Sequence, residues 1–182
     1  GSGSNDLAGT SRIAPLVFLY RKDRDGLLKA VQAQTAITHN NASTLAGADL
    51  IARIAWEVLH GAAPAEAVRS EVEKGVADIS LDTRLQTALE SAGEKSRTVI
   101  RSFGQNCAVD AALPGVVHLI LKYEQDLPTA LIENVMAGGD SAARGLVVGM
   151  ILGASTAGAT LPQEWSAGLR QHVRIEELLA KV

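Results

Sequence analysis

Apolar residues recur every three or four positions along much of the chain, which is the spacing that places them on one face of an α-helix. The first such pattern predicts a helix from Asp25 to the polar turn at 38–41. A second helix, capped by Asn41 or Ser43, is expected to end at Gly61. It has the clearest apolar face in the first half of the chain, formed by Leu50, Ile51, Ile54, Ala55, Val58 and Leu59.

The middle of the chain carries weaker signals for helix boundaries. We expect a helix over 64–76, with proline in its first turn, and another over 83–92 that Asp82 caps. The periodicity fades over 97–114, so we expect a structured loop there, followed by a short helical stretch. Residues 116–121 are apolar almost all round, and this pattern predicts a helix at the centre of the core.

Two aspartates mark the helices of the last third of the chain. Asp126 can cap a helix that ends at Gly138 and Gly139, and Asp140 can cap the next one. In the first of these helices the residues expected to face the core are Leu131, Ile132, Val135 and Met136. In the second, a glycine at every fourth residue predicts that another backbone packs closely at Gly145, Gly149 and Gly153. Two short helices, near 162–168 and 174–181, are expected to complete the chain.

The composition favours an all-α protein. The 182 residues include six aromatic residues, 3% of the chain, which is too few for an ordinary β-sandwich or β-barrel. With 47% hydrophobic residues the chain can build a sizeable core, so we expect a single helical domain over 5–182. Residues 1–4 have neither the basic nor the apolar segment of a signal peptide, and we interpret them as a tag or a loop stub.

Net charge and cysteine content limit the classes to which this protein can belong. The chain has 17 Lys and Arg against 20 Asp and Glu, a net charge of −3, which argues against a nucleic-acid partner. Its one cysteine, Cys107, excludes an internal disulfide and favours a reducing compartment, so a cytoplasmic location is expected. The charge-free stretch between Arg144 and Glu164 has the length of a membrane span. Only residues 146–154 are strongly apolar, however, so we interpret it as a buried helix and expect no membrane partner.

The motifs of common enzymes do not occur in the sequence, which has no zinc-binding histidine pair, nucleophile elbow or phosphate loop. Cys107 precedes apolar residues and is interpreted as a small buried hydrophobe rather than a nucleophile. Two polar clusters lie at helix boundaries, at 38–41 and at 138–141. Each fits two interpretations: an ordinary turn with a helix cap, or a place where the chain approaches a ligand.

Four short motifs follow one another along the chain. They are Ser11-Arg12-Ile13-Ala14-Pro15-Leu16, then Thr38-His39, then Asn134-Val135-Met136-Ala137-Gly138-Gly139-Asp140, and finally Pro162-x-x-Trp165. Their order and spacing resemble the C-terminal part of the ADP-ribosylglycohydrolase family, over the chain from about Asn5. The resemblance implies a compact all-α fold. It also implies an activity in which two magnesium ions help to remove ADP-ribose from a modified side chain or a related ADP-ribosyl compound.

The resemblance assigns residues to a site, although it names no catalytic residue. The loop at 6–12 is similar to the family loop that helps to hold the ligand, and His39 matches a Thr-His motif near the ADP-ribose site. Asp140 matches the first aspartate of the family's metal motif, Gly-Gly-Asp-x-Asp-Thr. The residues implied to contact the substrate are Gly9, Thr10, Ser11, His39 and Gly139, and the implied metal ligand is Asp140.

The metal motif departs from the family's pattern. Ala142 and Ala143 stand where the second aspartate and the hydroxyl are expected, and Arg144 adds a positive charge beside them. Because alanine has no side-chain oxygen to offer a hard cation, we expect a degraded magnesium site.

The family's amino-terminal portion, which supplies further metal ligands, has no counterpart in this sequence. We therefore expect either self-association through uncovered apolar faces or a completing segment from outside the sequence. Two functions stay open. The first is a weakened or incomplete hydrolase of an ADP-ribosyl N- or O-glycosidic bond. The second is a noncatalytic relative that binds ADP-ribose or serves as a helical interaction scaffold.

Overall fold

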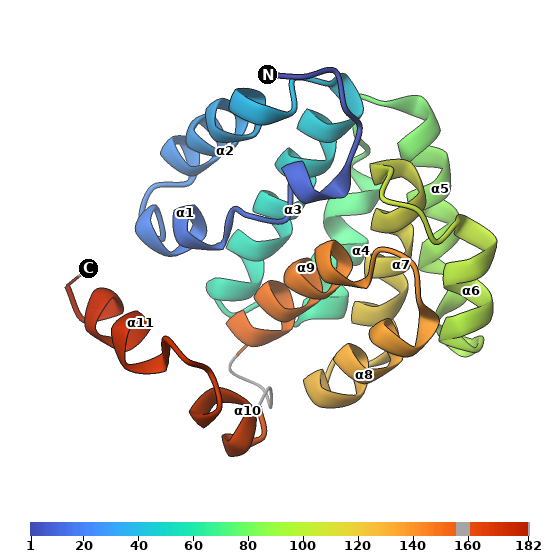
Figure 1. Ribbon diagram of the computed structural model, residues 1–182. Coiled ribbons are helices and arrows are strands. Elements are labelled where there is room, and N and C mark those ends of the chain that lie inside the picture. The colour runs from blue at the N-terminus through green and yellow to red at the C-terminus, as the bar shows by residue number, and fades with distance from the viewer. Residues whose placement is uncertain (156–160, 182) are drawn as a thin grey trace.

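The computed structural model describes residues 1–155 and 161–181, and within them it confirms an all-α fold (Figure 1). Besides helices, this part of the chain has two isolated β-bridges. In chain order the helices are η1 (Leu7–Gly9), α1 (Ala14–Leu19), α2 (Arg24–Thr38), α3 (Ala42–Leu59), α4 (Pro64–Glu73), α5 (Ile79–Leu89), η2 (Ser91–Gly93), α6 (Ser96–Phe103), α7 (Val109–Lys122), α8 (Leu127–Ala137), α9 (Ser141–Ala154), α10 (Gln163–Ala167) and α11 (His172–Leu179).

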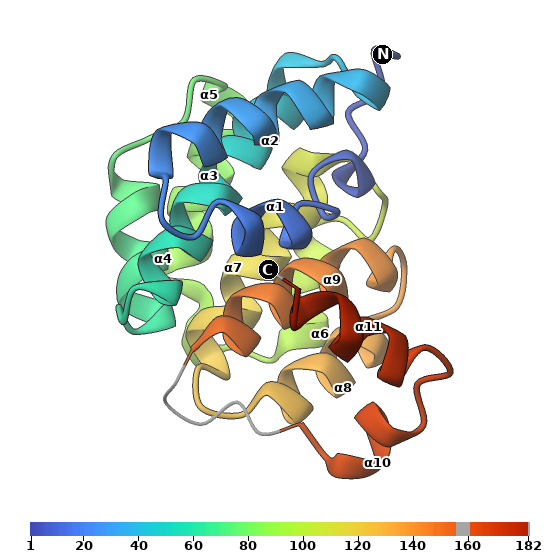
Figure 2. The same ribbon diagram turned by 90° about the vertical axis from the view of Figure 1, so that its left-hand side faces the viewer.

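Helix α7 is the centre of the fold, as its apolar pattern predicts. It packs against α3, α4, α5, α6, α8 and α9. From Val109 to Ile120 every residue except Asp110 is buried. Figure 2 shows α7 in the middle of the molecule, with α2 and α3 above it and α8 below. The elements that carry the predicted site residues are therefore arranged around one buried helix.

Pro114 lies inside α7, where it has no N–H to donate to the carbonyl of Asp110. Arg84 of α5 supplies the missing donor, because its Nε lies 2.6 Å from that carbonyl oxygen. The same guanidinium donates to the carbonyl of Phe103, at the end of α6. One side chain thus ties α5 to both ends of the loop at 104–108.

Two predicted boundaries are wrong. Helix α5 begins at Ile79 and is capped by Asp78, whose carboxylate accepts from the N–H of Leu81 at 2.8 Å. Asp82 instead accepts from the N–H of Val76 at 3.0 Å and holds the preceding turn. Helix α6 occupies much of the region expected to be a loop. Because this helix has eight residues, about two turns, it contributes too few buried positions for a helical period to show in the sequence.

The inward face predicted for α8 is also wrong. Ile132, Val135 and Met136 are exposed, and Leu131 is half-buried. The residues of α8 that face the core are Leu127, Ala130, Asn134 and Ala137. Small and polar side chains are buried here because Asn134 hydrogen-bonds to α9, and that contact sets the rotation of the helix.

The glycines of α9 do not mark a close backbone contact, contrary to the prediction. A Cβ atom added at Gly149 or Gly153 would meet no other atom of the described residues within 4 Å. At Gly145 the nearest atom would be Nδ2 of Asn134, at 3.0 Å. Gly149 and Gly153 therefore lie along an open face of the helix, whereas Gly145 faces side chains of α8.

The two ends of the chain are placed differently. Residues 2–4 run beside the end of α2, where the N–H of Ser2 donates to Thr38 and its carbonyl accepts from Asn40. Helices α10 and α11 have no buried residue and lie at the edge of the molecule (Figure 1). Within the described part of the chain no helix is long and apolar enough to cross a membrane. Residues 156–160, which belong to the charge-free stretch, lie outside the described residues.

Candidate functional site

The loop at 6–12 is held against the start of α7 by backbone hydrogen bonds. The N–H of Leu7 donates to the carbonyl of Cys107, and the N–H of Val109 donates to that of Asn5, both at 2.7 Å. Asp6 caps the short helix η1, because its carboxylate accepts from the N–H of Ala8 at 2.8 Å. Helix η1 also contacts α3 and α9. Segments far apart in the sequence therefore meet at this end of the bundle.

Gly9 and His39 lie in contact, as their assignment to one site requires. A Cβ atom at Gly9 would lie 2.6 Å from Cγ of His39 and 2.9 Å from Cγ2 of Thr44. The imidazole thus occupies the space that a side chain at Gly9 would need. His39 is half-buried, so one side of its ring is open to solvent.

Thr10 and Ser11 are buried, and their hydroxyls point back to their own turn. The hydroxyl of Thr10 donates to the carbonyl of Leu7 at 2.9 Å, and that of Ser11 donates to Ala8 at 3.4 Å. These side chains hold the shape of the loop. A direct contact from either of them to a ligand stays a prediction.

Arg12 connects this loop to His39 through a chain of hydrogen bonds. Its Nη2 donates to the hydroxyl of Thr38 at 2.6 Å, and its Nε donates to the carbonyl of Ala8 at 3.0 Å. The Thr38 hydroxyl lies 2.9 Å from Nδ1 of His39. Arg12 is exposed, so a permanent positive charge and an imidazole stand side by side at the surface of the site.

The loop at 104–108 is hydrogen-bonded to the turn that contains Gly139 and Asp140. The N–H of Asp140 donates to the carbonyl of Gln105 at 2.9 Å, and the side-chain amide of Gln105 donates to Ala137. Gly139 has a φ of +68°, and a Cβ atom there would lie 1.9 Å from the Gln105 carbonyl oxygen. A glycine is required at position 139 by contact with the protein itself.

Cys107 lies in the same loop and is exposed, so the interpretation of a buried hydrophobe is wrong. Its thiol donates a hydrogen bond to the carboxylate of Asp6, which is the largest of the effects that raise the thiol pKa. Partial burial and the negative charges of Asp6 and Asp140 raise the pKa further. Asp6 therefore contacts Cys107, and the thiol is kept protonated and weakly nucleophilic.

Replacing Asp6 by asparagine should make Cys107 more reactive. The variant loses the negative charge and the strongest acceptor of the thiol, so the thiol pKa falls and iodoacetamide alkylation at pH 8 speeds up by about threefold or more. The rate is measured by mass spectrometry of the intact protein. Asp25→Asn, on the exposed surface of α2, is the control and should leave the rate unchanged. Equal rates in Asp6→Asn and the unaltered protein would contradict the contact between Asp6 and Cys107.

The residues around Asp140 do not fit a pair of magnesium ions. One oxygen of Asp140 accepts from the N–H of Ala143 at 3.3 Å, as an ordinary helix cap does. Ala142 is exposed where a second carboxylate would be needed, and its methyl group offers no oxygen. Among residues 1–155 and 161–181, no three His, Cys, Asp or Glu side chains gather closely enough to hold a metal.

Arg144 lies behind the cap of α9 and is fully buried. Its Nε donates to the Asn134 side chain at 2.9 Å and its Nη2 donates to the carbonyl of Gly138 at 2.5 Å. Nη1 has no hydrogen-bond partner among the residues that the structure describes. This guanidinium braces the Gly138 turn and places a buried positive charge near Asp140. A fixed cation at this position further disfavours divalent metal ions there.

Sequence reasoning missed two members of the site, Gln105 and Cys107. Both lie in a loop whose partners come from 5–7 and 137–140, and a contact between distant segments leaves no periodic signal in the sequence. The available hint was Gly104, which has a φ of +111° and ends α6.

Comparison with known proteins identifies the family of this chain. The family model described as ADP-ribosylglycohydrolase matches residues 1–182. An uncharacterized protein of Archaeoglobus fulgidus is 25% identical over 185 residues, which cover 100% of this chain and 59% of the relative. The chain thus spans less than two thirds of that relative's length. Because the family model matches the whole chain, the protein belongs to the ADP-ribosylglycohydrolase family.

Proposed function

We propose that this chain binds ADP-ribose, or the ADP-ribosyl group of a modified substrate, at the surface formed by the loop at 6–12, His39, the loop at 104–108 and Asp140. The observation that carries the proposal is the convergence of these four segments at one end of the bundle. Each of the four contributes a polar group or a close backbone turn. Family membership supplies the class of ligand.

The exposed Arg12 and the half-buried His39 suit the diphosphate of such a ligand. Arg12 donates one hydrogen from Nε to the carbonyl of Ala8 and one from Nη2 to the hydroxyl of Thr38. The side chain is exposed, which leaves its other N–H groups accessible to a ligand. A guanidinium binds phosphate oxygens through charge-assisted hydrogen bonds, and the neighbouring His39 ring adds a further donor. The diphosphate is therefore expected beside the Arg12–Thr38–His39 chain.

The opposite side of this surface is acidic. The carboxylate of Asp6 accepts from the Cys107 thiol, the negative charge of Asp140 acts on the same thiol, and both aspartates are half-buried. Carboxylates repel phosphate but accept hydrogen bonds from hydroxyl groups, so this side suits a ribose. The two kinds of group divide the surface into a phosphate end and a sugar end.

Hydrolysis of an ADP-ribosyl N- or O-glycosidic bond is the second candidate function. It is favoured by the position of Asp140, a carboxylate at the expected place in a member of this family. Against it stand the methyl groups of Ala142 and Ala143 and the buried charge of Arg144. We therefore propose binding without magnesium-dependent turnover as the function that the residues of this chain support best.

The test is calorimetric titration of the chain with ADP-ribose, with and without magnesium. We expect saturable binding that magnesium changes little, and His39→Ala should weaken it by about tenfold or more. His60→Ala is the matched control, because His60 is exposed just beyond the other end of α3 and should leave the affinity within about twofold.

Three results would contradict the proposal. One is the absence of ADP-ribose binding by a cooperatively folded chain. Another is an equal loss of affinity for ADP-ribose in His39→Ala and His60→Ala. The third is release of ADP-ribose from a modified peptide that depends on both magnesium and Asp140, which would instead support the hydrolase.

A further inference from the structure

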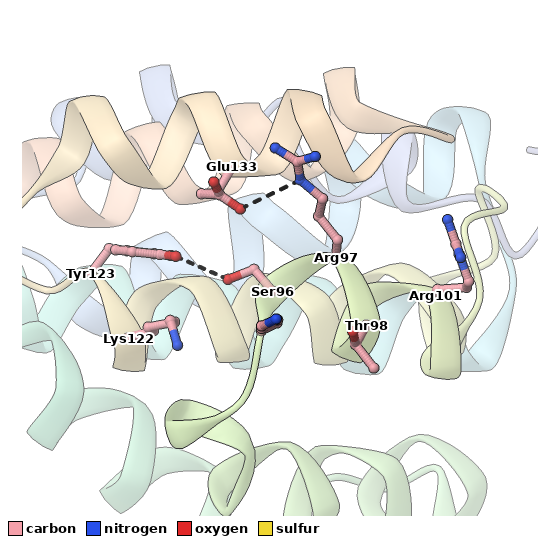
Figure 3. A pocket seen from close by; sticks show the side chains of 8 residues that line it. Ser96, Arg97, Thr98, Arg101, Lys122, Tyr123 and Glu133 are labelled. Carbon is pink, nitrogen blue, oxygen red and sulfur yellow. Dashed lines mark hydrogen bonds and ion pairs between the residues drawn. The ribbon is translucent and has the colours of Figure 1, made fainter.

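A second polar pocket lies between α6, the end of α7 and α8, and it shares no residue with the site described above (Figure 3). Its volume is about 620 Å³, within the range of small-molecule sites. Four cationic side chains and one carboxylate line it, in a chain whose net charge is −3. The cationic residues are Lys95, Arg97, Arg101 and Lys122, and the carboxylate is Glu133.

Ser96 and Tyr123, which line this α6 pocket, belong to a chain of hydrogen bonds that leads into the core. The hydroxyl of Ser91 donates to the carbonyl of Ala88, so it can only accept from Nδ1 of His118. Burial lowers the pKa of His118 to about 4, which keeps the ring neutral and leaves Nε2 as an acceptor for the Ser96 hydroxyl. The phenol of Tyr123 must then donate to Ser96, across 3.1 Å.

This chain of hydrogen bonds has two consequences for the pocket. Every hydroxyl hydrogen in it already has an acceptor, so Ser96 and Tyr123 are held in place before any ligand arrives. The Tyr123 oxygen can accept a hydrogen bond from a ligand but has no hydrogen left to donate. The charged donors of the pocket are its cationic side chains.

The cations divide into a structural one and three that face solvent. The ammonium of Lys122 donates to the carbonyls of Ala92 and Glu94, and so it braces the turn before α6. Lys95, Arg97 and Arg101 are exposed. Figure 3 shows Arg97 and Arg101, one turn apart, extending from the same side of α6. Glu133 lies 3.9 Å from Arg97, too far for a tight pair, and the Arg97 side chain is 53% exposed.

The backbone at the start of α6 adds to the positive electrostatic potential in the pocket. The first turn of α6 begins at Ser96, lines the pocket and has no side-chain cap. The N–H of Thr98 donates to the carbonyl of Lys95 at 2.9 Å. The helix dipole favours an anion at this helix end. The lining cations and the start of α6 therefore both favour binding of an anion in the pocket.

We propose that the α6 pocket binds a phosphoryl anion, as part of a small phosphate or diphosphate ester. Arg97 and Arg101 contact the phosphoryl oxygens, and Lys95 adds charge at the rim. The Tyr123 oxygen accepts from a hydroxyl group of the ester. The volume suits a small organic phosphate rather than inorganic phosphate alone. This site is separate from the proposed ADP-ribosyl surface and does not depend on it.

The test uses inorganic pyrophosphate as the probe, at constant ionic strength. NMR follows the arginine Nε–H signals and, in the variants, the backbone N–H signals of α6. We expect saturable shifts of Arg97 and Arg101, and the double variant Arg97→Ala/Arg101→Ala should bind at least about tenfold more weakly. Glu133→Gln removes the competing negative charge and should tighten binding by about threefold.

The controls separate this pocket from general charge effects and from the other site. Lys29→Ala removes an exposed cation on α2, and His39→Ala alters the ADP-ribosyl surface; both should leave pyrophosphate binding within about twofold. The proposal is overturned if no saturable shift occurs at millimolar pyrophosphate. It is equally overturned if Lys29→Ala weakens binding as much as the double arginine variant.

Discussion

Gly139→Ala is expected to destabilise the protein by about 2–4 kcal/mol, because two separate costs meet at one residue. The backbone at Gly139 has a φ of +68°, which an L-residue with a Cβ atom rarely adopts. The new methyl group would also lie 1.9 Å from a backbone oxygen of Gln105, so the loop at 104–108 or the turn at 138–140 must move. Urea unfolding measures the loss, and ADP-ribose binding should fall with it.

Gly149→Ala is the matched control, with the opposite expected sign. Gly149 lies inside α9 and faces open space, so alanine should stabilise the helix by about 0.5–1 kcal/mol. The pair therefore also tests the finding that Gly149 of α9 makes no close contact. A destabilised Gly149→Ala variant, or a Gly139→Ala variant as stable as the unaltered protein, would contradict the packing described here.

Arg53→Ala is expected to destabilise the protein by about 3 kcal/mol, because it removes a partner of the fully buried Glu71. Burial alone would raise the pKa of Glu71, but hydrogen bonds from Lys74 and Arg53 outweigh it and keep the pKa below its ordinary value. In the variant only Lys74 remains, at 2.6 Å and half exposed to solvent. The free energy of unfolding at pH 7 measures the effect.

The pH dependence of the same variant gives a second measurement. A carboxylate whose folded-state pKa is depressed contributes stability above its unfolded-state pKa, and that stability is lost as the pH falls. Arg53→Ala raises the pKa of Glu71, so less stability should be lost on acidification from pH 7 to pH 4 than in the unaltered protein. The double variant Arg53→Met/Glu71→Leu leaves no buried charge unpaired and should be more stable than Arg53→Ala. A double variant less stable than Arg53→Ala would contradict a net cost of the orphaned charge.

The candidate site was only partly predictable. A likeness of short motifs pointed to Gly9, His39 and Asp140, and the structure brings their segments to one end of the bundle. It also changes what several residues do there. Thr10 and Ser11 hold their own loop, and Gly139 accommodates Gln105. Cys107 joins the site although nothing local in its sequence marks it.

The sequence by itself determined the helical class, most helix boundaries and the central position of α7. These properties follow from spacing and from capping residues such as Asn41, Asp126 and Asp140, which act within a few residues of their own position.

Only the tertiary structure decided which face of each helix is covered. The apolar residues of α8 predict one buried face, yet the contact of Asn134 with Arg144 turns another face inward. The glycines of α9 suggest a close neighbour, yet none is present at Gly149. The physical reason is that burial and hydrogen-bond partners depend on segments far apart in the chain, whereas helical periodicity records only what is local.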